Sequence, residues 1–356
     1  MTVRKLRQYV PLTREEFRRR FFERFYDPAF DDVKPELEKV FERAWDGYIR
    51  YRKSPRTRPA GPGFADPAFQ LPVEWLAARA AIEQAERRNR DPAAPSRILV
   101  VSAATRSEHT CPGETSKTWR LADHARKVIE AEAGFEADLL ELARLADEPW
   151  KVIHPCKACV STSMALCHWP CSCYPNHAMG QTNDWMNELY PRWVAAHGVL
   201  IACPVHWYQA PASLKLMMDR LVCADGGNPD PTSTAGKDPE KAKALELAGW
   251  PYPRHLAGRA FAVVAHGDSQ GHEDLRRSLT QWLTDMGLSQ AGDSAAFDTL
   301  IGYYEPYATS HDKLDGSPDV FTEVSNAAQS LVNRVRAIRS GEYVPPDAAL
   351  RHPRQK

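Results

Sequence analysis

The sequence predicts an α/β fold built around an open parallel β-sheet. Three short apolar runs, at 97–102, 199–203 and 258–265, have the continuous hydrophobic character of strands buried on both faces. Each run is followed by a loop and then by apolar residues at helical spacing. In an open parallel sheet these loops gather at the carboxyl edge of the strands, where ligands bind. We therefore expect the functional residues in these loops.

Length and charge narrow the classes of protein to which the chain can belong. Its 356 residues allow a core of about 200 residues with an appendage. Lysine plus arginine equals aspartate plus glutamate, at 46 each, so no overall basic field attracts nucleic acid or anionic lipid. Residues 1–7 lack the apolar core of a signal peptide, and no apolar run approaches membrane-spanning length. We expect a cytoplasmic protein, bound to neither nucleic acid nor membrane, whose cysteines are thiols or metal ligands.

Residues 1–95 are predicted to form a helical N-terminal extension. Thr13 and Glu16 make a capping box before a run of phenylalanines, and a second amphipathic helix follows Pro35. The segment 54–67 is rich in proline and glycine and is predicted to be a linker, with a third helix over 73–88. We expect the aromatic stripe of this extension to pack on the rest of the chain; binding to a partner or a second subunit is the alternative.

The α/β domain is predicted to span 96–340, with a loose tail over 341–356. Further strands are expected at 135–142 and 297–302. Further helices are expected after a Thr182-Asn183 cap, over 273–286 and over 321–338. The polar segment 225–255 is an insertion with a short lysine-rich helix, long enough to be a lid or a subunit contact.

The loop after the first strand, 103–118, has the features of a phosphate site. It is rich in hydroxyl side chains and leads into a helix that begins near Thr115-Ser116-Lys117-Thr118. The backbone N–H groups and the positive dipole at a helix start favour a phosphate, and Arg106 adds a cation that can bind phosphate oxygens in a fork. A plain capped helix is the alternative interpretation. The chain contains neither the P-loop pattern nor G-x-G-x-x-G, so a Walker or Rossmann site is not supported.

The loop after the third strand carries the most specific signal. It reads Pro204-Val205-His206-Trp207-Tyr208 and precedes Ser213, Lys215 and the pair Asp219-Arg220. Ser213 is predicted to cap the helix that follows. An ordinary β-loop-α unit with packed aromatics is one interpretation of this stretch. The same residues resemble the signature of the NAD(P)H-dependent FMN reductases of flavodoxin-like fold, although an aromatic residue usually stands where this chain has His206.

The resemblance extends over about 97–339 and implies a flavodoxin-like, doubly wound parallel sheet. It assigns the FMN phosphate to Thr105, Arg106, Ser116, Lys117 and Thr118. It assigns the flavin ring to Pro204, Val205, His206, Trp207 and Tyr208, and to His266, Gly267 and Asp268 in the loop after the fourth strand. The chain departs from the family pattern in two ways: the usual opening glycine of the phosphate loop is absent, and 109–113 are inserted.

The resemblance also implies the activity. We expect FMN to take a hydride from NAD(P)H and pass electrons to a small-molecule acceptor: a free flavin, a quinone, an azo or nitro compound or a metal oxyanion, or to another redox protein. No catalytic side chain is assigned. A flavodoxin-like electron carrier or redox sensor acting on a partner protein is the alternative. Since flavin sites in this family often lie at a dimer interface, we expect a dimer or a tetramer.

Five of the eight cysteines fall in one short stretch, which indicates metal or redox chemistry. They are Cys156, Cys159, Cys167, Cys171 and Cys173. The stretch resembles the cysteine loop of iron–sulfur flavoproteins, a branch of the same family, whose cysteines bind a 4Fe–4S cluster; here the third cysteine follows after seven residues rather than two. The ligand set is open between Cys171 and Cys173, and structural zinc, a dithiol relay and unligated thiols are the alternatives. The flanking His154, His168 and His177 are expected to be solvated loop residues.

Overall fold

The computed structural model describes residues 8, 10–50, 56–148, 151–159, 164–168, 170–171, 173, 184–221, 227–249, 254–346 and 348–349. The chain divides into two compact units. The N-terminal unit consists of Met1–Ala80, Lys157–Asp184 and Gly227–Pro251. The sheet unit consists of Ala81–Cys156, Trp185–Gly226 and Tyr252–Lys356. Each unit is described separately below.

The sheet unit contains six parallel strands. Along the sheet they run β4 (Phe135–Glu141), β3 (Ser96–Ser102), β5 (Gly198–Pro204) and β6 (Ala260–Gly267), with β7 (Ser289–Gln290) and β8 (Ala296–Leu300) both paired to β6. In chain order this is second, first, third, fourth and fifth, the order of flavodoxin-like sheets. The predicted fold class is therefore confirmed; the two-residue strand β7 was not foreseen.

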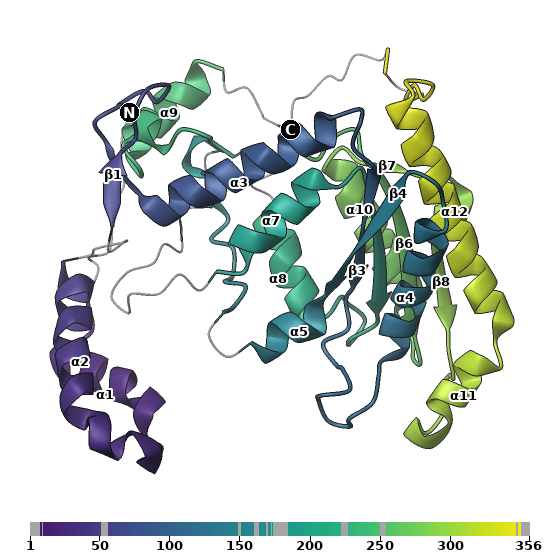
Figure 1. Ribbon diagram of the computed structural model, residues 1–356, viewed down its shortest axis with the longest axis horizontal. Helices are drawn as coiled ribbons and strands as arrows, with labels where there is room; N and C mark the ends of the chain where they lie inside the picture. Colours follow the sequence, from purple (N-terminus) through teal and green to yellow (C-terminus); the bar gives the residue numbers. More distant parts are fainter. Residues whose placement is uncertain are drawn as a thin grey trace. The chain divides into compact units, whose positions relative to one another are not determined.

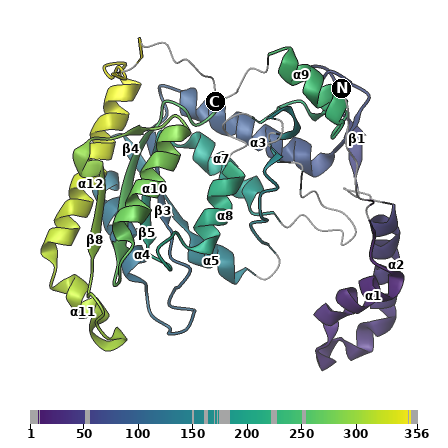
Figure 2. The same ribbon diagram turned by 180° about the vertical axis from the view of Figure 1, so that it is seen from behind.

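Helices cover both faces of this sheet (Figures 1 and 2). Alternate strand residues such as Val100, Leu200 and Ala262 point to one face, into a core shared with α4 (Lys117–Glu130) and α12 (Pro318–Arg339). The opposite face carries α5 (Leu142–Asp147), α7 (Met186–Ala195), α8 (Ala212–Leu221) and α10 (His272–Asp285). Burial of every central strand on both faces explains the uninterrupted apolar runs in the sequence.

Two details of the sheet unit differ from the predictions. The predicted N-cap Ser213 is wrong, because α8 already begins at Ala212 and the N–H of Lys215 donates to the carbonyl of Pro211 at 3.0 Å. The tail after Gly341 does not begin as a loose segment. There the carbonyl of Ala337 accepts hydrogen bonds from the N–H groups of Glu342 and Tyr343 at 2.9 and 3.0 Å, which ties the chain back to α12. A short helix α11 (Ser310–Asp315) precedes α12.

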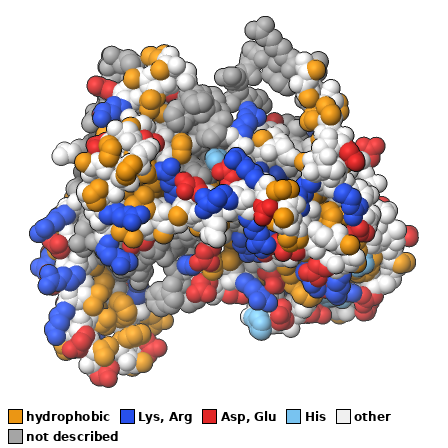
Figure 3. All heavy atoms as spheres, turned by 45° about the horizontal axis from the view of Figure 1, so that its top comes forward, with side chains coloured by type: hydrophobic (Ala, Val, Ile, Leu, Met, Phe, Trp, Pro, Cys, Tyr) orange, Lys and Arg blue, Asp and Glu red, His pale blue; other side chains and the backbone are white. Residues whose placement is uncertain are grey.

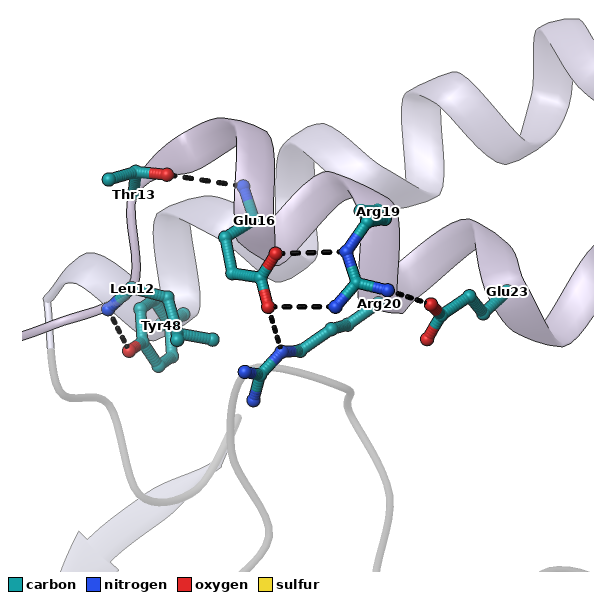
Figure 4. Close-up of polar contacts among 7 residues, drawn as sticks. All are labelled: Leu12, Thr13, Glu16, Arg19, Arg20, Glu23 and Tyr48. Carbon is teal, nitrogen blue, oxygen red and sulfur yellow. Dashed lines mark hydrogen bonds and ion pairs between the residues drawn. The ribbon is translucent and has the colours of Figure 1, made fainter.

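The N-terminal unit begins with a helical hairpin, α1 (Arg14–Phe22) and α2 (Lys34–Ile49). Its core consists of Phe17, Phe21, Phe41 and Ala44. Thr13 caps α1 as predicted, since its hydroxyl accepts from the N–H of Glu16 at 3.2 Å (Figure 4). The predicted return half of the capping box is not formed: the Glu16 carboxylate accepts from Arg19 and Arg20 instead.

The segment predicted as a linker contains a short strand. In it β1 (Thr57–Pro59) pairs antiparallel with β2 (Gln70–Pro72), before α3 (Val73–Arg90). The insertion predicted at 225–255 holds α9 (Pro239–Leu247) and folds with this unit rather than as a separate lid. Its side chains explain why: Asp230 and Thr232 accept hydrogen bonds from the backbone N–H groups of Ala65 and Asp66 at 2.7 and 3.0 Å. The two units are thus discontinuous in sequence.

The surface agrees with the balanced composition. On the face seen in Figure 3, basic and acidic side chains are interspersed rather than gathered into a field of one sign. None of the described helices is long and apolar enough to cross a membrane.

Candidate functional site

Four loops of the sheet unit leave the carboxyl ends of the strands. They are 103–116 after β3, 205–211 after β5, 268–271 after β6 and 301–309 after β8. The strand order reverses between β3 and β5, because successive strands extend from β3 in opposite directions. Ligands of open α/β sheets bind at this switch point. The two loops with the strongest sequence signals are the ones that flank it.

The loop after β3 is braced by its own hydroxyl groups. The N–H of Ser107 donates to Thr110 Oγ1 at 3.1 Å, and Ser107 Oγ accepts from the N–H of His109 at 3.2 Å. Ser116 then caps α4 by accepting from the N–H of Trp119 at 3.1 Å. Lys117 follows as the first residue of the helix. The loop therefore delivers the chain to a helix N-terminus with its backbone N–H groups oriented.

Two cations and one carboxylate share the space at the start of α4. Lys117 Nζ donates to the carbonyl of Ile301 at 3.0 Å. Burial lowers the pKa of Lys117; the charge of Asp268 opposes this shift and that of Arg106 reinforces it. Lys117 is thus within electrostatic reach of both Arg106 and Asp268. The dipole and the free backbone N–H groups at the start of α4 favour a bound anion such as a phosphate monoester.

Thr118 and His266 are joined beneath this loop. Thr118 Oγ1 lies 2.8 Å from His266 Nε2, and the histidine is only 4% exposed. Burial, reinforced by the charges of Lys117 and His206, lowers the pKa of His266 to about 3, so the ring is neutral. His266 Nδ1 is buried and has no hydrogen-bond partner in the part of the chain that the structure describes. The predictions that Thr118 holds the FMN phosphate and that His266 contacts the flavin ring stay predictions.

The loop after β5 is a tight aromatic turn. The N–H of Val205 donates to the carbonyl of His266 at 2.8 Å. Backbone hydrogen bonds of 2.9 and 3.0 Å then join His206 and Gln209 in both directions. Trp207 and Tyr208 between them have φ angles of 49° and 67°. This is the two-residue turn geometry that normally selects Asn or Gly.

Aromatic residues in this turn are strained and exposed. The left-handed conformation costs roughly 1–2 kcal/mol for a residue with a Cβ. Burial does not repay the cost, because Trp207 is 94% exposed and Tyr208 59% exposed. Backbone strain of this kind is concentrated at functional sites. The turn presents two rings to solvent at the switch point, the arrangement expected for a planar ligand.

The loop after β6 packs closely against this turn. A Cβ on Gly267 would lie 3.2 Å from Val205 Cγ2, and a Cβ on Gly271 would lie 2.8 Å from Tyr208 Cα. Gly271 also has a φ of 107°. Glycine at both positions therefore permits the close approach. Sequence reasoning identified Gly267 but not Gly271.

Sequence reasoning also missed the loop after β8. The N–H of Tyr304 donates to the carbonyl of Asp268 at 2.9 Å, and Gln270 Nε2 donates to the hydroxyl of Tyr303 at 3.3 Å. The hydroxyl of Tyr307 donates to the Glu114 carboxylate in the phosphate loop. The signal in the sequence was the run Tyr303-Tyr304 directly after a strand.

The charged residues of α8 form local contacts. Lys215 Nζ pairs with Asp219 at 2.5 Å on the exposed face of the helix. Arg220 is buried, and its Nη1 donates to the carbonyl of His154 at 3.1 Å. The bond from Arg220 ties the end of α8 to the segment around His154.

The structure brings Cys173 into contact with two other clustered cysteines, Cys159 and Cys171. Cys159 Sγ and Cys173 Sγ are 3.4 Å apart. The hydrogen bond with Cys159 raises the pKa of the Cys173 thiol, Cys171 lowers it, and burial raises it further. Cys167 is buried, and its carbonyl accepts from the N–H of Asn228 at 2.5 Å. Cys156 falls in the other unit.

The remaining predictions for this stretch are mixed. His168 is buried, with Nε2 3.4 Å from Thr234 Oγ1, so its prediction as a solvated residue is wrong. His177, together with Thr182 and Asn183, lies outside the described residues. None of the described cysteines is joined in a disulfide, in keeping with the expected thiols.

Among the described residues, a metal-like group of three side chains occurs at His272, Glu273 and Asp298. His272 Nδ1 lies 2.7 Å from Asp298, whose other oxygen accepts from Arg276 Nε. A guanidinium so close to the carboxylate makes this an ion-pair network that links α10 to β8.

Comparison with known proteins places this geometry in a family. The sequence model described as NADPH-dependent FMN reductase matches residues 96–299. An iron-sulfur flavoprotein of Methanosarcina thermophila is 30% identical over 184 residues, which are 50% of this chain and 75% of that protein.

Solved structures include similar chains. RosB with a bound 8-demethyl-8-formylriboflavin-5'-phosphate intermediate is 16% identical, with a TM-score of 0.46 over 70% of this chain and 82% of that one. The apo form of an NADH:FMN oxidoreductase (EMOB) is 18% identical, with a TM-score of 0.37 over 73% and 97%.

The family match begins at the first residue of β3 and ends within β8, and so includes the phosphate loop and the aromatic turn. It covers more than half of the 356 residues. The chain belongs to the NADPH-dependent FMN reductase family and is an FMN-dependent oxidoreductase.

Proposed function

We propose that this chain holds FMN non-covalently at the carboxyl edge of its sheet and transfers electrons from NAD(P)H to a separate acceptor. The observation that carries the proposal is the capped N-terminus of α4 at the switch point, where Ser116 accepts from the N–H of Trp119 at 3.1 Å and Lys117 begins the helix. The free backbone N–H groups and the positive dipole end at this helix start favour a phosphate. The exposed aromatic turn at the same edge supports a planar ring beside it.

Different loops of the site would bind different parts of FMN. Thr105, Arg106, Ser116 and Lys117 would hold the phosphate, and Trp207 with Tyr208 would hold the ring. Gly267 and Asp268 would approach the ring edge. When bound, FMN supplies hydride acceptance from NAD(P)H and onward electron transfer. The chain itself contributes orientation and charge, because hydride transfer requires no protein acid or base.

The purified protein tests this proposal directly. It should be yellow and should release FMN on heating. A colourless protein that also fails to bind added FMN would overturn the proposal.

Arg106→Ala tests the phosphate site. It should weaken FMN binding by about 1.5–3 kcal/mol, the scale of a hydrogen bond to a charged group. Fluorescence titration of the apoprotein with FMN measures the change. Arg277→Ala is the matched control, because that side chain is 74% exposed on α10. Equal FMN affinity in Arg106→Ala and the parent would remove Arg106 from the site.

The cysteine stretch supports a second redox group. We propose a 4Fe–4S cluster ligated by Cys156, Cys159, Cys167 and either Cys171 or Cys173. Cys173 contacts both Cys159 and Cys171, so the choice of the fourth ligand stays open between Cys171 and Cys173. Thiolates suit iron–sulfur and zinc equally, so structural zinc is the main rival. When bound, the cluster would supply one-electron exchange with FMN.

Metal analysis distinguishes a 4Fe–4S cluster from structural zinc and from a dithiol relay. Anaerobic protein with a cluster should be brown and contain about four iron and four sulfide per chain. One zinc per chain without iron would indicate a structural site, and neither metal would leave a dithiol relay. Cys156→Ser should lose the metal while FMN stays bound, because the phosphate loop and the aromatic turn lie elsewhere in the chain. Loss of FMN together with the metal would contradict this separation.

An electron carrier or redox sensor remains the second candidate function, favoured by the helical hairpin and the dense cysteines. Steady-state oxidation of NADH or NADPH with a quinone decides between the two. Turnover near zero with intact flavin would favour the carrier. We also propose a dimer or tetramer; a monomer by light scattering would refute it.

A further inference from the structure

The loop 268–271 lies between two exposed aromatic pairs. On one side Gly271 packs against the backbone of Tyr208, next to Trp207. On the other side the backbone of Asp268 bonds Tyr304, and Gln270 bonds the hydroxyl of Tyr303. The two pairs thus flank the same loop at the carboxyl edge of β6. Trp207 and Tyr208 belong to the proposed flavin site, and Tyr303 and Tyr304 form the second pair.

The backbone of Tyr304 carries the same kind of strain as the aromatic turn. Five described non-glycine residues have a positive φ, and three of these are aromatic: Trp207, Tyr208 and Tyr304, the last at 51°. Tyr208 and Tyr304 both contact loop 268–271. A bulky side chain in this conformation is a genuine outlier. Such outliers persist where the surrounding structure requires them, and they gather at functional sites.

Packing does not account for the rings of Tyr303 and Tyr304. They are 48% and 73% exposed, and their centroids lie 4.5 Å apart at an interplanar angle of 70°. The edge-to-face contact holds the rings in a fixed mutual orientation. The result is a preformed aromatic surface open to solvent.

We propose that Tyr303 and Tyr304 form the binding wall for a planar aromatic electron acceptor, of the quinone class. This inference rests on the proposed function, since the acceptor must approach the flavin edge. The two phenol rings offer π-faces and edges for stacking. Recognition here is by stacking rather than by charge, because Lys313 beside the loop after β8 is paired with Glu305 at 3.1 Å.

The reaction balances with the cofactors already named. In one turnover NAD(P)H loses a hydride and becomes NAD(P)⁺. The quinone gains two electrons and two protons and becomes a hydroquinone; one hydrogen derives from the hydride and the second proton from solvent.

The variants Tyr303→Leu and Tyr304→Asn, singly and together, test the wall. Asn tolerates the left-handed conformation, so Tyr304→Asn removes the ring while leaving the backbone favourable. Its melting temperature should therefore not fall below that of the parent. NAD(P)H oxidation is measured with a 1,4-naphthoquinone and, separately, with ferricyanide, which has no aromatic plane. Bound FMN is quantified in each preparation.

The double variant should raise KM for the naphthoquinone roughly five- to tenfold, as expected for the loss of aromatic contacts. KM for ferricyanide and the FMN content should stay at the parent values. Tyr26→Asn is the matched control, because that side chain is 88% exposed in the N-terminal unit, and it should change neither KM.

Three results would overturn the inference. An unchanged KM for the naphthoquinone would show that the rings do not bind the acceptor. An equal rise for ferricyanide would show a general disturbance of the site, and loss of FMN from Tyr304→Asn would assign the ring to the cofactor. A parent that lacks flavin and does not reduce ferricyanide would instead contradict the proposed function, and this inference with it.

Discussion

Protonation of His266 should make the fold sensitive to acid. Its pKa is lowered from 6.5 to about 3 by burial, so the unfolded chain takes up a proton at a higher pH than the folded chain does. The stabilisation from the neutral buried ring is complete above pH 6.5 and declines as the pH falls toward about 3. pH 5 lies about 1.5 units below the unfolded-state pKa of 6.5. Protonation of the unfolded chain therefore lowers the free energy of unfolding by about 2 kcal/mol at this pH.

His266→Gln isolates this effect, because Gln does not titrate and can still reach the Thr118 hydroxyl. The free energy of unfolding is measured by urea denaturation at pH 7.5 and pH 5.0. The parent should lose about 2 kcal/mol more than His266→Gln between these values. The variant will differ in absolute stability, but only the difference between the two pH values enters the comparison.

His109→Gln is the control, because that side chain is 80% exposed. It should keep the pH dependence of the parent. If His266→Gln shows the same loss as the parent between pH 7.5 and 5.0, the buried ring is not the source of acid sensitivity. The assignment of His266 as a neutral, buried ring bonded to Thr118 would then fail.

Three further variants probe other parts of the sheet unit. Burial lowers the pKa of His197 to about 4, so His197→Gln should reduce the loss of unfolding free energy between pH 7.5 and pH 5.0 by about 2 kcal/mol. The same urea denaturation series measures this loss, and a loss equal to that of the parent would contradict the prediction. Gly271→Ala should destabilise by roughly 1–3 kcal/mol and disturb the turn at Tyr208, measured by urea denaturation and FMN titration; full stability would refute the close approach. Arg192→Lys should cost roughly 1.5 kcal/mol in urea denaturation by breaking the two-pronged pair with Asp138; no change would mean that the pair contributes little.

The elements of the sheet unit could be predicted because local sequence determines them. Strands β3, β5 and β6 are central and buried on both faces, so their apolar runs are continuous. The helix over 318–339 was visible from its periodic apolar face. The two-residue strand β7 has too few residues for a periodic signal.

The grouping of distant segments could not be predicted. Residues 157–184 and 227–251 belong to the N-terminal unit, and bonds such as that from Trp75 Nε1 to the carbonyl of Pro170 at 2.8 Å connect them to it. These bonds connect residues far apart in sequence and leave no periodic pattern. The burial of His168 is missed for the same reason, because its neighbour Thr234 lies in the later insertion.

For the site, sequence motifs located the loops but not their contacts. The phosphate loop and the aromatic turn follow the predicted strands. The bond between Thr118 and His266 joins α4 to β6, and it requires the sheet order before it can be seen. Tyr304 was missed because its importance lies in a backbone angle, which the sequence does not display.

Two buried histidines of the sheet unit differ in the hydrogen bonds that their ring nitrogens make. His197, before the amino end of β5, has both ring nitrogens bonded: Nδ1 accepts from the N–H of Arg97 and Nε2 lies 2.9 Å from the carbonyl of Asn89. His266, at the carboxyl end of β6, is bonded at Nε2 and has no partner at Nδ1 among the described residues. The strained aromatic residues Trp207 and Tyr304 lie at that same edge. A buried ring nitrogen without a partner among the described residues, together with strained aromatic residues, indicates that the carboxyl edge is shaped for a ligand rather than for stability.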